Sequence, residues 1–181
     1  DGLALLLAEG GVTISRGFAV VAGTGVVVLG MKGPSGTATF ANGASIRLGR
    51  DVTLSASTGS EVIFASAWRD SGGGPNPAVA FDIGRVDNLG TVVLKAFLPD
   101  SITTVDVYPG ATAKLDGGDE TIYHQTPVVL GLGSTLDLNG TDQPLDSLTL
   151  KTSNTTVTGG TLTLNSSLVE VDGTGGGHDI Q

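Results

Sequence analysis

The feature that most constrains the fold is an alternation of apolar and polar residues that stops every few positions at glycine or Asn-Gly. In GSTLDLNGTDQPLDSLTL, from Gly133 to Leu150, leucines alternate with polar residues on both sides of such a break. Similar short runs extend from VTIS at residue 12 to LVEVDG at residue 168, with starts about every 7 to 10 residues. Alternation with period two indicates strands, and the 29 glycines suit tight corners between them. We find no helical stripe and expect an all-β fold.

A second, longer repeat is superimposed on this alternation. GTVVLKA from Gly90, GATAKLD from Gly110, GSTLDLN from Gly133 and GTLTLNS from Gly160 align without gaps, and GASIRLG from Gly43 fits the same template. Repeats of about 20 to 30 residues that each hold about three short strands are typical of a β-solenoid. We therefore predict a parallel β-helix of five or six coils, in which the corners differ in length.

The alternation also predicts which side chains face the core. Leu136 and Leu138 should point into the coil, whereas Thr135 and Asp137 point outward, and Asn139-Gly140 should supply the left-handed backbone of a corner.

The same reasoning applies further along the chain. Leu148 and Leu150 should point inward, with Thr149 and Lys151 facing solvent, and Val169 and Val171 should repeat the inward set. The exposed Asp142 and Asp146 should then be solvent-facing surface residues.

One segment interrupts the alternation of apolar and polar residues. WRDSGGGPNP, residues 68–77, concentrates glycine, proline and the only tryptophan, and we expect a loop inserted in a single solenoid domain of residues 1–172. An exposed Trp68 beside Arg69 and Asp70 would be a candidate binding site for a sugar or a protein. The alternative is that Trp68 folds back over a loose corner. Residues 173–181 read as a glycine-rich tail.

Charge and composition limit the kinds of partner that this chain can bind. The formal net charge is −9, and residues 101–181 carry only Lys114 and Lys151 as basic side chains against ten acids, so nucleic acid is an unfavourable partner. The chain has no cysteine, which excludes disulfides and thiol chemistry. LALLLA, residues 3–8, is too short to span a bilayer and reads as a terminal strand. Because the first residue is Asp1 rather than Met, we expect a mature or excised segment.

GSTLDLNGTDQPLDSLTL, followed by GGTLTLNSS, resembles the repeats of autotransporter passenger domains and related bacterial surface proteins, over roughly residues 110–173. The resemblance implies a right-handed parallel β-helix that is exported to the cell surface or beyond and serves as a stalk or adhesive rod. The absence of cysteine suits the export route of that family. Such rods carry adhesins, proteases and inert spacers alike, so the resemblance speaks to architecture more than to activity.

Candidate chemistry is sparse. The densest acidic group is Asp116, Asp119 and Glu120, followed by Tyr123 and His124. This group is either a shallow cation site or a set of turn residues, and the preference of aspartate for turns favours the second interpretation.

No other motif indicates catalysis or metal binding. The two histidines, His124 and His178, have no third ligand at metal spacing, and GTGGGHD at residues 173–179 departs from the register of glycine-rich calcium repeats. We expect no catalytic residue, no metal and no cofactor.

These observations favour a non-enzymatic structural protein, extracellular or on the bacterial cell surface, that forms a filament or part of an adhesive stalk. We find no amphipathic cap helix, so the solenoid ends should be covered by continuing chain or by other copies stacked end to end. The alternatives are a carbohydrate-binding module, with surface glycans as partners, and a polysaccharide-degrading β-helix enzyme with its site near Asp116 or Asp137.

Overall fold

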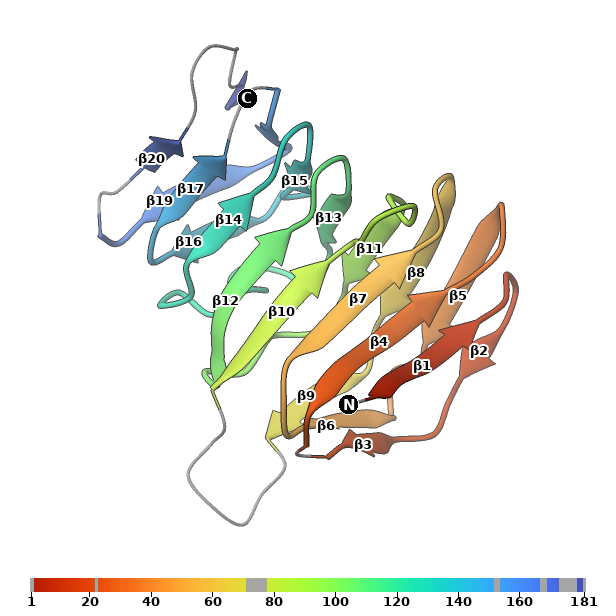
Figure 1. Ribbon diagram of the computed structural model, residues 1–181. Coiled ribbons are helices and arrows are strands. Elements are labelled where there is room, and N and C mark those ends of the chain that lie inside the picture. The colour runs from red at the N-terminus through yellow and green to blue at the C-terminus, as the bar shows by residue number, and fades with distance from the viewer. Residues whose placement is uncertain are drawn as a thin grey trace.

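The structure, a computed structural model, describes residues 2–21, 23–70, 78–151, 154–166, 169–172 and 179–180. Within these residues it is an all-β parallel solenoid of about seven turns with roughly three strands per coil, which confirms the predicted architecture. The coils follow one another from β1 at one end to β20 at the other (Figure 1). The expected five or six coils were too few, because that number assumed three strands in every coil, whereas several coils have only two among the described residues.

Two parallel sheets of eight strands form two sides of every coil. The first, sheet A, contains β1 (Gly2–Ala8), β4 (Gly25–Met31), β7 (Val52–Ala56), β10 (Val79–Ile83), β12 (Ile102–Val107), β14 (Val128–Leu130), β17 (Leu148–Lys151) and β20 (Val169–Asp172). The second, sheet B, contains β2 (Thr13–Ile14), β5 (Gly36–Phe40), β8 (Ser60–Phe64), β11 (Thr91–Leu94), β13 (Thr112–Leu115), β15 (Thr135–Asp137), β18 (Thr156–Thr158) and β21 (Asp179–Ile180).

The third side is less regular. It consists of a three-stranded sheet, β3 (Phe18–Val20), β6 (Ser45–Leu48) and β9 (Ala67–Asp70), and a two-stranded sheet, β16 (Asp142–Leu145) and β19 (Thr161–Leu164). Between these two sheets, the described residues of the coils have no third strand, and the chain turns there around the buried Leu98 and Ile122.

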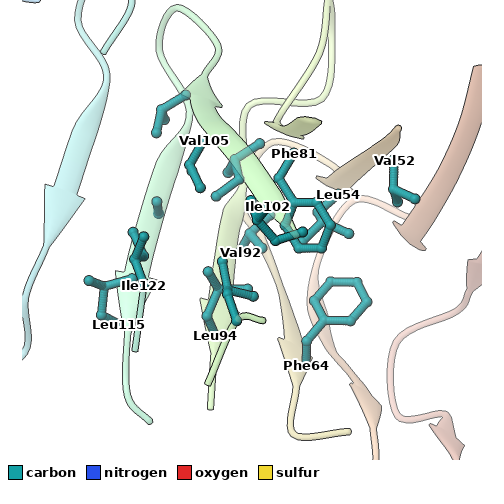
Figure 2. Packing of buried hydrophobic residues seen from close by; sticks show 14 of the residues in the cluster. Val52, Leu54, Phe64, Phe81, Val92, Leu94, Ile102, Val105, Leu115 and Ile122 are labelled. Carbon is teal, nitrogen blue, oxygen red and sulfur yellow. The ribbon is translucent and has the colours of Figure 1, made fainter. Parts of the chain in front are cut away.

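The core is a set of ladders in which equivalent residues of successive coils stack. Phe40, Phe64, Leu94 and Leu115 oppose one another in sheet B, and all four are fully buried (Figure 2 shows the last three). Parallel coils lie about 4.8 Å apart, so each inward side chain is covered by its counterparts on both sides. A coil therefore depends on its neighbours for most of its buried apolar surface.

The predicted orientations hold in the middle of the solenoid. Leu136 and Leu138 are buried, and Asn139 and Gly140 have φ values of 49° and 80°, the left-handed conformation expected at the corner. Leu148 and Leu150 are also buried, while Lys151 is exposed.

The predicted burial fails at Val171, which occupies the position equivalent to the inward Leu150 but is 51% exposed. Strand β20, which contains Val171, pairs with β17 on one side, and no described strand covers its other side. The side chain of Val169 lies outside the described residues.

The repeat alignment was correct in one case. Thr112 of β13 opposes Thr135 of β15, as the alignment of Gly110 with Gly133 predicts. Strand β11, however, pairs with β13 with a shift of one residue, since Thr91 opposes Thr112 rather than Ala111.

The other two alignments joined different sides of the solenoid. The segments that follow Gly43 and Gly160 form β6 and β19, which belong to the third side and not to sheet B. All three sides share the same alternation, so a gapless template cannot distinguish them.

The structure corrects the expectation of an exposed Trp68. Strand β9 includes Trp68, Arg69 and Asp70, and the Trp68 side chain is only 6% exposed. Its ring lies 5.4 Å from that of Phe64 and 5.0 Å from that of Phe81, between centroids. Trp68 is therefore part of an aromatic column inside the coil, which stabilises the core instead of presenting a binding surface.

The remainder of the expected loop, residues 71–77, and most of the expected tail, residues 173–178 and 181, lie outside the described residues. Within the expected tail, Asp179–Ile180 forms β21 and pairs with β18. Sheet B thus extends beyond residue 172.

We predict that Trp68→Ala lowers the free energy of unfolding by about 3–5 kcal/mol, the usual cost of truncating a buried aromatic side chain. Trp68→Phe should cost less because it keeps a ring between Phe64 and Phe81. Denaturant unfolding followed by circular dichroism measures both. A Trp68→Ala protein as stable as the wild type would contradict the buried position.

Candidate functional site

The carboxylates at the acidic corner after β13 form contacts that stabilise the fold. Asp116 Oδ2 lies 2.6 Å from Lys95 Nζ, and its Oδ1 accepts a 2.9 Å hydrogen bond from Asn139 Nδ2. Asp119 Oδ1 accepts a 2.8 Å hydrogen bond from the backbone N–H of Asp142. These contacts connect neighbouring coils, so both carboxylates hold the corners of the solenoid together. The interpretation as turn residues fits this arrangement better than a cation site.

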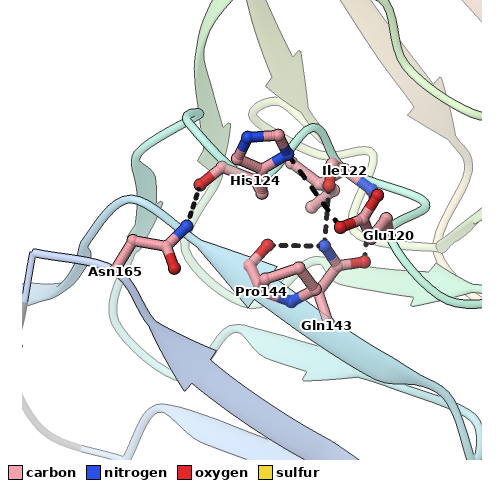
Figure 3. Close-up of polar contacts among 6 residues, drawn as sticks. All are labelled: Glu120, Ile122, His124, Gln143, Pro144 and Asn165. Atoms are coloured by element: carbon pink, nitrogen blue, oxygen red, sulfur yellow. Dashed lines mark hydrogen bonds and ion pairs between the residues drawn. The ribbon is translucent and has the colours of Figure 1, made fainter.

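The residues that follow the corner form a second set of polar contacts (Figure 3). Glu120 Oε1 lies 3.9 Å from His124 Nδ1, and Asn165 Nδ2 donates a 2.7 Å hydrogen bond to the His124 carbonyl. The Tyr123 ring contacts His124 and the exposed Phe97 at centroid distances of 4.4 and 6.4 Å. In the described part of the chain, no group of three or more acidic or histidine side chains is placed to hold a metal ion.

A buried amide replaces strand pairing on this third side. Gln143 Oε1 accepts a 3.2 Å hydrogen bond from the backbone N–H of Ile122, and Gln143 Nε2 donates to the Ile122 and Pro144 carbonyls at 2.7 and 2.8 Å (Figure 3). The Gln143 side chain is fully buried. It therefore gives Ile122 the donor and the acceptor that a neighbouring strand would otherwise supply.

Asp137 also has a structural role. Its Oδ1 accepts a 2.9 Å hydrogen bond from the backbone N–H of Asn139, a local contact that fixes the corner. Asp116 and Asp137 thus both contact Asn139, from different coils. His178 lies outside the described residues.

Another candidate for ligand binding is a groove on the outer face of sheet A. It has a volume of about 620 Å³ and crosses several coils. Thr53, Asp82, Asp106 and Val129 occupy equivalent outward positions on β7, β10, β12 and β14 and line it in succession. Thr53 is only 8% exposed although it faces outward, which shows that the sheet surface is hollowed here.

Two glycines flank Tyr108 in a neighbouring row of residues along this groove. Gly84 and Gly131 flank Tyr108 on the preceding and following coils, and all three line the groove. A Cβ added at Gly84 would lie 2.4 Å from Ala111 Cβ, and one at Gly131 would lie 2.7 Å from a Pro109 ring atom. Side chains are thus sterically excluded beside the Tyr108 ring, which is 37% exposed.

Two carboxylates from successive coils meet in the groove. Burial raises the pKa of Asp82, and the neighbouring carboxylates of Asp106 and Asp51 raise it further, against a hydrogen bond from Thr53. Burial also raises the pKa of Asp106, although the positive charge of Lys151 opposes this shift. Both acids are therefore easier to protonate than free aspartate and well placed to share hydrogen bonds with hydroxyl groups.

Cationic side chains balance these acids. Arg85 and Lys151 line the same groove, and neither forms an ion pair within 4 Å with another described residue. The lining therefore carries two acidic and two basic side chains, together with Tyr108 and apolar surface from residues such as Leu132.

The sequence analysis missed this groove because Asp82 and Asp106 are 24 residues apart. A signal was present: FDIG at residue 81 and VDVY at residue 105 both place an aspartate between two inward apolar residues. Recognising them as neighbours requires the coil length at this point, which the corners determine and which the strand pattern does not reveal.

A second exposed surface lies at the β1 end of the solenoid. The outward residues Leu3 and Leu5 are 54% and 53% exposed, and the inward residue Leu6 is 39% exposed. An apolar depression of about 250 Å³ opens there between Leu6, Phe18 and the start of the core. Among the described residues, nothing covers the interior of this coil from the end.

Comparison with protein-family models, with curated proteins and with solved structures finds no match to this chain. In the described residues, no helix has the length and apolar character needed to cross a membrane.

We predict that Gln143→Ala destabilises the fold by several kcal/mol, because it leaves a cavity and removes both partners of the Ile122 backbone. Asn165→Ala, which removes a hydrogen bond at the exposed surface of the same side, should cost much less. Chemical denaturation of the two variants compares these costs, and equal effects would contradict the role of the Gln143 amide.

We predict that Asp82→Asn makes the protein more stable at pH 7. Folding raises the Asp82 pKa, so the folded chain holds this proton more tightly than the unfolded chain does. The free energy of unfolding must then fall as the pH rises from the unfolded value of about 4 through the folded pKa, and it stays lower above that pKa. Asparagine removes the charge that causes this loss.

Thermal unfolding of wild type and Asp82→Asn between pH 3 and pH 8 checks this prediction. The difference should be largest near neutral pH and disappear at the acidic end. Asp100→Asn, at an exposed turn position, serves as the control and should show no comparable gain. A variant less stable than the wild type at pH 7 would refute the proposed electrostatic cost.

Proposed function

We propose that this chain is a non-enzymatic structural segment of an extracellular or cell-surface rod, which extends by head-to-tail stacking of copies through the solenoid ends. The observation that carries the proposal is the state of β1. Its outward Leu3 and Leu5 and its inward Leu6 are all exposed, and among the described strands it pairs only with β4. The resemblance to autotransporter-type repeats supports a place at the bacterial surface.

An edge of this kind favours association. A long apolar strand with unpaired N–H and C=O groups is a template for another strand, and soluble proteins normally block such edges with charges, proline or a covering element. Strand β1 has none of these between Leu3 and Ala8. Its exposed leucines would also leave much apolar surface in contact with water.

The geometry of the two ends is complementary. Sheet A has β1 as its outermost strand at one end and β20 at the other, and sheet B has β2 and β21 in the equivalent positions. All strands in each sheet are parallel, so β20 of one copy and β1 of the next would continue the same ladder. The exposed Val171 would then be covered as its inward counterparts are. A contact between two different surfaces does not close and generates a filament.

The described contacts also support a structural role in preference to an enzymatic one. The acids that the sequence offered as a catalytic group, Asp116, Asp119 and Asp137, each accept a hydrogen bond that fixes a corner. Their carboxylates act in the scaffold, and the outer surface of the rod is left for adhesion.

The test is the state of the purified chain in solution. We expect electron micrographs to show unbranched filaments, and light scattering to report a mass that rises with protein concentration. Leu6→Lys introduces a charge into the open coil and should shift the mass to that of a monomer. Val86→Lys, at an exposed corner of a middle coil, is the matched control and should still assemble. A wild-type chain that stays monomeric at all concentrations would refute stacking.

A further inference from the structure

We propose that the groove on the outer face of sheet A binds a neutral, extended polysaccharide, which lies along the solenoid axis and stacks one sugar ring on Tyr108. This site goes beyond the structural role proposed above and does not depend on it, since the groove lies on the lateral face of the rod and neither β1 nor β20 lines it.

The shape of the groove selects an extended polymer. Its residues come from β4, β7, β10, β12, β14 and β17, so it runs across the strands, along the direction in which the coils stack. Successive coils repeat at about 4.8 Å. An extended β-linked hexose chain advances by a similar length per sugar, so each sugar would meet an equivalent backbone position on the next coil.

The Tyr108 ring provides the apolar contact. Sugar rings have apolar faces of C–H groups that pack on exposed aromatic rings, and tyrosine adds a hydroxyl group for hydrogen bonding. The Tyr108 hydroxyl has no hydrogen-bond partner among the described residues. Gly84 and Gly131 leave bare backbone beside the ring, and Val129 and Leu132 extend the apolar surface.

The polar lining fits hydroxyl groups better than a charged ligand. Asp82 and Asp106 accept hydrogen bonds, while Arg85 and Lys151 donate them, so sugar hydroxyls find both kinds of partner. The two positive charges offset the two negative charges within the groove. The net charge of −9 on the whole chain disfavours anionic polymers in addition.

The experiment is isothermal titration calorimetry of the full chain with a panel of linear hexasaccharides. The neutral members are cellohexaose and mannohexaose, and the charged members are hexagalacturonate and chitosan hexamer. We expect at least one neutral hexasaccharide to bind. No binding by either neutral hexasaccharide, or binding confined to the charged ones, would overturn the proposal.

Variants then locate the site. Tyr108→Ala should weaken the binding about tenfold or more, whereas Tyr108→Phe keeps the stacking ring and should retain most of it. Phe97→Ala removes an exposed aromatic ring on another side of the solenoid and is the matched control. Thermal unfolding confirms that each variant is folded. If Tyr108→Ala is misfolded, Arg85→Ala provides the second test and should also weaken binding. Binding that depends on Phe97 and not on Tyr108 or Arg85 would refute the groove as the site.

Discussion

The stacking of equivalent residues on successive coils is the interaction on which the rest of this structure depends. Backbone hydrogen bonds fix each strand in register with the strand of the next coil, and the register places like side chains on top of one another. A coil of 20 to 30 residues cannot bury its own apolar side chains, so its stability comes from both neighbours. Leu136 is fully buried for this reason, whereas Leu6 and Val171 remain exposed although they have the same inward orientation. The ends are thus a direct consequence of the interaction that builds the middle.

The same register explains where side chains meet. Asp82 and Asp106 are distant in sequence but directly opposed on adjacent coils, and their proximity contributes to the raised pKa of Asp82. Surface carboxylates of this solenoid also contact residues one coil away, as Asp116 contacts Lys95 and Asn139. A functional surface on this fold is assembled from single positions of several coils, and it runs along the axis instead of gathering in one loop.

This arrangement also explains what the sequence could and could not predict. The alternation of Leu136 and Leu138 and the Asn139-Gly140 corner were enough to predict short strands, their inward side chains and a corner, because these depend only on local geometry. The solenoid itself was predicted from the longer repeat of about 20 to 30 residues. The pairing of strands depends on the length of every corner, and there the template failed: Gly160 precedes a strand of the third side, and Thr91 is shifted by one residue. Trp68 was misplaced because its glycine-rich neighbours suggested a loop, although its ring lies within a buried aromatic column, between Phe64 and Phe81. The groove required correct pairing and so could not be found.

The two exposed surfaces, the β1 end and the lateral groove, require different features of the sequence. At the β1 end, an apolar coil is open because its counterpart is absent among the described strands, and any parallel strand with inward apolar residues would satisfy it. The lateral groove demands more of the sequence, since Gly84 and Gly131 must lack side chains while Tyr108 between them keeps a large one. Repetition alone produces the first surface, because every coil has apolar inward positions. Repetition does not produce the lateral groove, because like residues on successive coils would place a similar side chain at each of the positions 84, 108 and 131. The departure from repetition at Tyr108 is thus the feature that distinguishes this face from the rest of the rod.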